Sequence, residues 1–247
     1  MPELEPIAWT ALAVGAVMAG FSKTGINGAG LLTVGLFAAV LPARPSTGLV
    51  LLVFLTADVF GILTYRAHAH WPTLRRLAPA VVVGIGAGVV FLVYVDDTAL
   101  RRTIGAVLLA LVAFHLWYRR RSGEGGMREL PAPVTAAAGA GAGFTTMVAN
   151  TGGAVMSVYL LGARLPMLTF LGTTVWFFFL VNLFKTPFSI ALGLIDATSV
   201  LTALMLVPAV VVGAVVGRWL IRRIQQSTFE WLVLASTVLA GLNLLLR

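Results

Sequence analysis

The sequence contains no cysteine and few charged residues. The absence of cysteine excludes disulfide bonds, thiolate metal sites and cysteine nucleophiles. Charged residues make up only 11% of the 247 residues, less than half of the roughly 25% typical of soluble domains. His68, His70 and His115 do not form a metal-ligand set, and no glycine-rich stretch ends in the Gly-Lys-Ser/Thr of a phosphate-binding loop. We therefore expect no metal, no cofactor and no ATP site.

Apolar residues dominate what is present. They account for 59% of the chain, and the mean hydropathy is +0.98. These values are typical of a polytopic membrane protein. The formal net charge of +8 comes mostly from arginines in short loops between apolar runs, which is how membrane topology is encoded. The positive charge therefore does not indicate nucleic-acid binding. The start, MPELEPIAW, lacks the basic region of a cleavable signal peptide.

Apolar segments of two kinds follow one another along the chain. Six are about as long as the 20 residues that cross a bilayer, namely 46–65, 74–95, 98–118, 167–192, 198–219 and 228–246. Two others, 7–41 and 134–162, do not fit a single span and are interrupted by glycine and polar residues. We expect each of these to be a broken or re-entrant hairpin. Half-helices of about 13 residues, or about 20 Å, would bring its tip to the middle of the bilayer.

An internal repeat links the two broken regions. The collinear matches are AGFSKTGINGAG (19–30) with AGFTTMVANTGG (142–153), TADVFGIL (56–63) with LVNLFKTP (180–187), and PAVVVG at both 79–84 and 208–213. The second match places Asp58 over Asn182. The fold predicted is all-α, with two repeats at 1–120 and 131–247 and a cytoplasmic linker at 121–130. Each repeat would consist of one hairpin and three spans.

The positive-inside rule indicates how the repeats are oriented. If both broken regions cross the membrane once, eight arginines lie inside and seven outside. If both are hairpins, eleven lie inside and four outside, which is the bias expected of a membrane protein. Arg101 and Arg102 remain on the outside and go against the rule. The odd number of crossings in each half then makes the repeats inverted.

Polar residues at the two breaks predict a site for an anion. The returning half-helices begin near Gly28–Gly30 and Thr151–Gly153, where free N–H groups and the helix dipole attract negative charge. Asparagine amides, threonine hydroxyls and two lysines add donors, so that the two tips would meet at a donor-rich midplane site. The predicted substrate-binding residues are Lys23, Thr24, Asn27, Gly28, Gly30, Thr145, Asn150, Thr151, Gly152, Gly153, Thr173, Asn182 and Lys185.

Each of these features also has a simpler interpretation. Glycine-rich breaks often serve only helix packing, and Lys23 or Lys185 could reach a membrane surface. Asp58, a carboxylate well inside a span, is the candidate for proton coupling, or it could pair with either lysine as a structural residue. Thr173 and Thr174 could line the path or bond back to their own helix.

Three segments resemble the sulfite exporter TauE/SafE family. They are GFSKTGINGAGLL, NTGGAVMSVYLL and FLGTTVWFFFLVNLFKTPFSIALGLI. The matching positions are Gly20, Phe21, Lys23, Thr24, Gly25, Gly28 and Gly30 in the first half, and Asn150, Gly152, Gly153, Gly172, Thr173, Asn182, Lys185 and Pro187 in the second. Many relatives carry a proline near the second glycine of the Asn150–Gly153 segment, which this chain lacks.

The resemblance implies transport of a sulfur-containing anion, such as sulfite, thiosulfate or an organosulfonate, across the bacterial inner membrane. Export is the direction usual in the family. We therefore expect a secondary transporter whose partners are a small anion and the lipid bilayer, without nucleic acid; a homo-oligomer is compatible with the sequence. An anion channel of the same fold is the alternative. A membrane-embedded enzyme is a weaker one, because no histidine lies deep beside a serine or aspartate.

Overall fold

The structure is a computed structural model that describes most of the chain. The described residues are 5–25, 29–94, 113, 127, 129–225, 227–228, 231–232, 235, 238–239 and 242. Two of the predicted site residues, Asn27 and Gly28, lie outside this part. So do nearly all of the predicted span 98–118, most of 228–246 and most of the linker 121–130.

The described residues form helices and connecting turns, with no strand among them. In chain order the helices are α1 (Pro6–Thr24), α2 (Gly30–Val40), α3 (Ala43–Tyr65), the 3₁₀ turn η2 (Arg66–His68), α4 (Trp71–Tyr94), α6 (Ala132–Ala149), α7 (Gly152–Gly162), α8 (Met167–Ala191) and α9 (Ala197–Ile221). The predicted all-α class is therefore confirmed for this part of the chain.

The long helices agree with the predicted spans. α3, α4, α8 and α9 begin and end within a few residues of 46–65, 74–95, 167–192 and 198–219. These four helices and α1 are long and apolar enough to cross a membrane. Asp196 caps the N-terminus of α9, and its carboxylate accepts hydrogen bonds from the backbone N–H and the hydroxyl of Ser199. These bonds hold the pKa of Asp196 below its usual value.

Both broken regions form two helices, but the predicted equal arms of about 13 residues are wrong. α1 has 19 residues and α6 has 18, or about 27–28 Å at 1.5 Å per residue. The returning helices α2 and α7 have 11 residues each, or about 16 Å. Because α1 extends to Thr24, Lys23 lies on this helix rather than in a loop.

In each hairpin the short helix runs back along the long one. In the first, Gly30 lies beside Ser22, and the hydroxyl of Thr33 donates to the carbonyl oxygen of Gly15 at 2.8 Å. In the second, Gly152 packs against Thr146, and the hydroxyls of Thr135 and Tyr159 lie 3.2 Å apart. Both regions are therefore antiparallel helical hairpins.

The chain divides into two compact units. The first consists of residues 1–67 and 175–224 and contains α1, α2, α3, the second part of α8 and α9. Its apolar core joins α1, α2, α3 and α9 through buried side chains such as Leu12, Phe37, Val53 and Val210. The second unit consists of residues 68–174 and 225–247 and contains α4, α6, α7 and the start of α8.

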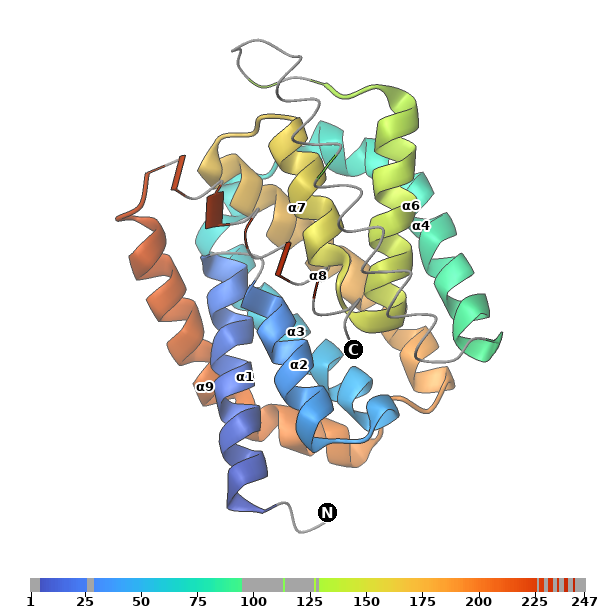
Figure 1. The fold of residues 1–247 in the computed structure, drawn as a ribbon, viewed down its shortest axis with the longest axis vertical. Coiled ribbons are helices and arrows are strands. Elements are labelled where there is room, and N and C mark those ends of the chain that lie inside the picture. Colours follow the sequence, from blue (N-terminus) through green and yellow to red (C-terminus); the bar gives the residue numbers. More distant parts are fainter. Residues whose placement is uncertain are drawn as a thin grey trace. The chain divides into compact units, whose positions relative to one another are not determined.

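Each unit contains a helix pair that packs through glycines. α1 and α9 lie side by side in the first unit, and α4 and α6 do so in the second (Figure 1). A Cβ atom on Gly20 of α1 would overlap the carbonyl oxygen of Val210, and one on Gly213 of α9 would overlap that of Val17. Only glycine permits so close an approach of two helix backbones.

The second pair repeats these contacts at the positions that the internal repeat makes equivalent. Gly143 of α6 lies against the carbonyl oxygen of Val81, and Gly84 of α4 lies against that of Ala140. Gly143 corresponds to Gly20 in the sequence match, and Gly84 corresponds to Gly213. In both pairs a hairpin helix from one predicted repeat is therefore packed against a span from the other.

Substitution of Gly84 by alanine is expected to lower the free energy of unfolding by about 1–3 kcal/mol, because the added methyl group must push α4 away from α6. Gly86 is the matched control on the same helix, since a Cβ atom there would have nothing within 4 Å. The melting temperatures of both variants would be measured by thermal unfolding in detergent. Equal melting temperatures for Gly84→Ala and Gly86→Ala would contradict the packing described here.

Candidate functional site

Four polar residues from three helices meet inside the first compact unit. Lys23 lies in the last turn of α1, Asp58 lies in α3, and Asn182 and Lys185 lie in α8. All four are buried, with exposed fractions of 4% for Lys23, 0% for Asp58 and 1% for Asn182 and Lys185. Neither lysine therefore reaches the protein surface in this structure. We refer to these four residues as the charge cluster.

Asp58 is at the centre of the charge cluster. Its Oδ1 atom lies 2.9 Å from the Nζ atom of Lys23, and its Oδ2 atom accepts a hydrogen bond of 2.7 Å from the Nδ2 atom of Asn182. Lys185 interacts electrostatically with both Lys23 and Asp58. Of the two pairings that the sequence left open for Asp58, the structure has the ion pair with Lys23.

Two aromatic rings surround the ammonium group of Lys23. Its Nζ atom lies 4.2 Å from the ring centre of Phe178 and 5.0 Å from that of Phe54. Such contacts stabilise a cation through the negative face of the ring. Sequence reasoning missed both phenylalanines. Helical spacing could have identified them, because Phe54 precedes Asp58 by four residues and Phe178 precedes Asn182 by four.

The tip of the first hairpin lies beside the charge cluster. A Cβ atom on Gly30 would be 3.4 Å from the ring of Phe54, the same ring that contacts Lys23. Gly30 begins α2, which has no side-chain cap at its N-terminus. The first N–H groups of a helix have no partner within it. The positive end of the α2 dipole is therefore close to Lys23.

The charge cluster carries an excess of positive charge. Two lysines and one aspartate give it a formal net charge of +1 in a buried environment. Burial of charge is unfavourable, and a nearby opposite charge relieves it. The cluster is therefore suited to an anion. Among the described residues, no group of three histidine, aspartate or glutamate side chains could hold a metal ion.

One face of α8 carries a further polar group. Thr174, Phe178 and Lys185 follow one another at intervals of four and seven residues, which places them on the same side of the helix. The hydroxyl of Thr174 is buried and has no hydrogen-bond partner among the described residues. Its neighbour Thr173, by contrast, accepts the backbone N–H of His70 at 2.9 Å. The two threonines are equivalent in the sequence, whereas their hydrogen bonds in the structure differ.

Three other predicted threonines bond to backbone carbonyls. Thr24 donates its hydroxyl hydrogen to the carbonyl oxygen of Ala214 at 2.8 Å and so joins α1 to α9. Thr145 donates to Gly141 in its own helix at 2.7 Å, and Thr151 donates to the carbonyl oxygen of Thr145 at 3.3 Å. These bonds use the single hydrogen that each hydroxyl can donate.

The second hairpin tip, residues 150–153, lies in the other compact unit. Asn150 ends α6 in the left-handed region, with φ of 54°, and its N–H donates to the carbonyl oxygen of Thr146. Gly152 lies against the carbonyl oxygen of Ala142, where a Cβ atom would be only 2.6 Å away, and Gly153 follows it in the first turn of α7. That this tip meets the first one stays a prediction.

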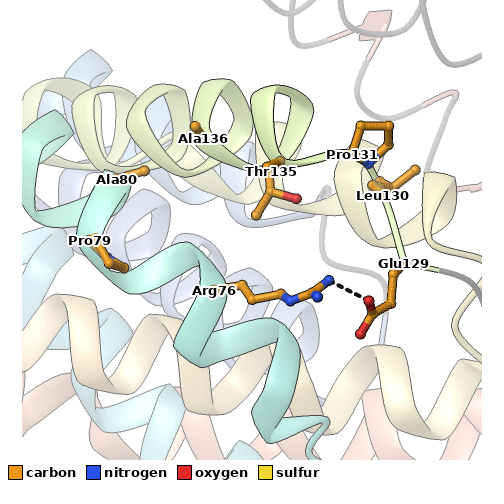
Figure 2. A pocket seen from close by; sticks show the side chains of 9 residues that line it. Arg76, Pro79, Ala80, Glu129, Leu130, Pro131, Thr135 and Ala136 are labelled. Atoms are coloured by element: carbon orange, nitrogen blue, oxygen red, sulfur yellow. Dashed lines mark ion pairs between the residues drawn. The ribbon is translucent and has the colours of Figure 1, made fainter.

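A cavity of about 550 Å³ in the second unit holds none of the predicted site residues. It lies between α4 and the start of α6, and Arg76 points across it toward Glu129 (Figure 2). The nearest atoms of this ion pair are 2.7 Å apart, and both side chains are more than half exposed. Since its charges cancel at the surface, this cavity lacks the buried positive excess of the charge cluster.

Comparison with known proteins gives the family. No match was found among curated proteins or among solved structures. The model of the family described as sulfite exporter TauE/SafE matches residues 12–244, nearly the whole chain. Such a family consists of membrane transporters rather than enzymes, so the prediction of a transporter is confirmed at this level. The chain belongs to the sulfite exporter TauE/SafE family.

Proposed function

We propose that this protein is a secondary transporter that exports a small sulfur-containing anion, such as sulfite or an organosulfonate. The observation that carries the proposal is the buried charge cluster with its formal net charge of +1. Ionisable groups within a membrane protein usually mark the path of a substrate or an ion. The bacterial inner membrane is the proposed location, following the family resemblance.

Lys185 is the proposed main contact of the anion. Lys23 already pairs with Asp58, so the positive excess of the cluster corresponds to the charge of one further lysine. The N-terminus of α2 at Gly30 is proposed to donate further hydrogen bonds to the anion. Asn27 and Gly28 at the first tip stay predictions, as do the donors of the second hairpin, Thr145, Asn150, Thr151, Gly152 and Gly153, and Thr173 in α8.

We also propose that the two repeats are inverted and that transport alternates access to the site by movements of helical bodies. The matched glycine contacts of Gly20 with Val210 and of Gly143 with Val81 support the repeat. So does the hydrogen bond between Asp58 and Asn182, because the repeat makes these two positions equivalent. Residues related by a two-fold axis meet each other only close to that axis.

Asp58 was expected as the candidate for proton coupling. Its ion pair with Lys23 and its hydrogen bond from Asn182 offset part of the unfavourable effect of burying a carboxylate. The alternative, coupling of transport to the membrane potential, does not require Asp58 to change its charge.

Anion flux into proteoliposomes tests the proposed function. Purified protein would be assayed with sulfite, methanesulfonate, thiosulfate, sulfate and chloride, with and without a pH gradient. We expect saturable flux of at least one sulfur-containing anion and little flux of chloride. Vesicles that carry none of the sulfur anions faster than protein-free vesicles would refute the proposal.

Thr174 and Thr173 are expected to respond differently to replacement by valine, which has nearly the same shape. Thr174→Val removes a hydroxyl that has no partner in the described residues, so the melting temperature should be unchanged or higher. Thr173→Val leaves the N–H of His70 without its acceptor and should lower the melting temperature. Measured melting temperatures that fall for Thr174→Val and stay unchanged for Thr173→Val would contradict this difference.

A further inference from the structure

We propose that Asp58 sets the charge of the transported anion and makes the protein selective for monovalent anions over divalent ones. The inference rests on the proposed function, because it assigns a substrate class to the same site. Asp58 cancels the charge of Lys23 at 2.9 Å and leaves the cluster with the excess charge of one lysine. One negative charge on the anion then makes the site neutral.

The other described carboxylates are far too exposed to contribute to this balance. Glu5, Glu129 and Asp196 are exposed, whereas Asp58 has no exposed surface at all. Asp58 is therefore the buried carboxylate of the described part of the chain. Among the described residues, the charged side chains of the site are Asp58 and the two lysines, and both lysines are buried as well.

Because the surroundings of the cluster are of low polarity, the net charge of the occupied site strongly affects which anion binds. Apolar rings of Phe54 and Phe178 lie next to Lys23, and interactions between charges are much stronger in such surroundings than in water. A divalent anion would leave the site with a net charge of −1, whereas a monovalent anion leaves none. Burial of the extra charge is unfavourable for the divalent anion.

This charge rule divides the candidate substrates into two chemical classes. Alkanesulfonates and hydrogensulfite carry one negative charge and fit the site. Sulfate, thiosulfate and doubly charged organosulfonates carry two and do not. Methanesulfonate and sulfate form a matched pair of probes, because both are tetrahedral and differ by a methyl group in place of one charged oxygen.

The test compares the ratio of methanesulfonate flux to sulfate flux in proteoliposomes that contain the wild type or one of three variants. The wild type, with a site charge of +1, should favour methanesulfonate by at least about tenfold. Asp58→Asn raises the site charge to +2 and keeps a side chain of the same shape beside Asn182. This variant should shift the ratio toward sulfate by at least about tenfold.

The double variant Lys23→Gln/Asp58→Asn returns the site charge to +1 through Lys185 alone. It should therefore recover the wild-type preference, whatever its absolute rate, and Asp58→Glu should keep that preference. A purely structural role of Asp58 predicts slower transport in these variants with no change in the ratio.

Three results would overturn the proposal. They are a wild type that carries sulfate as fast as methanesulfonate, a folded Asp58→Asn variant with an unchanged ratio, and a folded double variant that has lost the monovalent preference. If Asp58→Asn does not fold, the flux ratios of the wild type and the double variant still test the proposal. Loss of the charge rule with sulfur-anion flux retained would leave the proposed function standing, whereas absence of all anion flux would refute both.

Discussion

Replacement of Lys185 by glutamine is expected to reduce anion flux by at least about 100-fold without unfolding the protein. The side chain is 1% exposed and belongs to a buried cluster that otherwise contains one ion pair, Lys23 with Asp58. Without Lys185 the formal charge of the cluster is zero, and the attraction for an anion is lost. At about 4 Å and an effective dielectric constant of about 20, one such attraction amounts to about 4 kcal/mol.

The matched control for Lys185→Gln is Arg223→Gln. It also exchanges one positive charge for an amide, but Arg223 is exposed beyond the end of α9 and stacks on Trp219. Its flux should stay within about twofold of the wild type. Flux in proteoliposomes and melting temperature in detergent would be measured for both. If Lys185→Gln retained half of the wild-type flux, Lys185 would not be the anion contact.

Removal of Asp58 is expected to have the largest effect on stability. Asp58→Ala takes away the partner of Lys23 and the acceptor of the Asn182 amide and leaves two buried lysines close together. Loss of one partner of a buried ion pair lowers the free energy of unfolding by about 3–5 kcal/mol. Lys23→Met should be milder, because Lys185 also interacts with Asp58 and can balance its charge.

A double-mutant cycle separates the ion pair from simple loss of volume. Lys23→Met/Asp58→Leu replaces the pair by apolar side chains of similar size, and such exchanges of buried pairs are often neutral or stabilising. The double variant should therefore be more stable than the single variant Asp58→Leu. A double variant whose loss of stability equals the sum of the losses in Lys23→Met and Asp58→Leu would show that the pair is not coupled.

Local patterns in the sequence were sufficient to predict the helices. Apolar runs gave α3, α4, α8 and α9 nearly to their ends. Glycine and asparagine gave the break between α6 and α7, where Asn150 takes the left-handed conformation that ends a helix. These features depend on residues close together in the chain, so they can be predicted from local sequence patterns.

The lengths of the hairpin arms depend on distant contacts and were predicted incorrectly. Gly20 looks like the start of a break, but it is the point at which α1 approaches Val210 of α9. The hydroxyl of Thr24 also bonds to Ala214 in α9. Contacts with a helix almost 200 residues away therefore extend α1 through Thr24, which places Lys23 on a helix.

The residues of the charge cluster were predicted, but their pairing was not. Hydropathy alone identified Lys23, Asp58 and Lys185 as ionisable groups in apolar surroundings. Which lysine pairs with Asp58 depends on how α1, α3 and α8 pack, and the sequence does not contain this information locally. The same packing separates Thr174 from Thr173, two adjacent residues of the same type.

Counterflow in proteoliposomes tests the central claim most directly, that a small anion binds in a buried site and is carried across the membrane. Vesicles are loaded with an excess of the unlabelled sulfur anion and diluted into a trace of the same labelled anion. A transporter built on the charge cluster predicts transient accumulation of label above its external concentration in the wild type and none in Lys185→Gln. Passive entry of label without accumulation, equal in both proteins, would contradict it and indicate a channel.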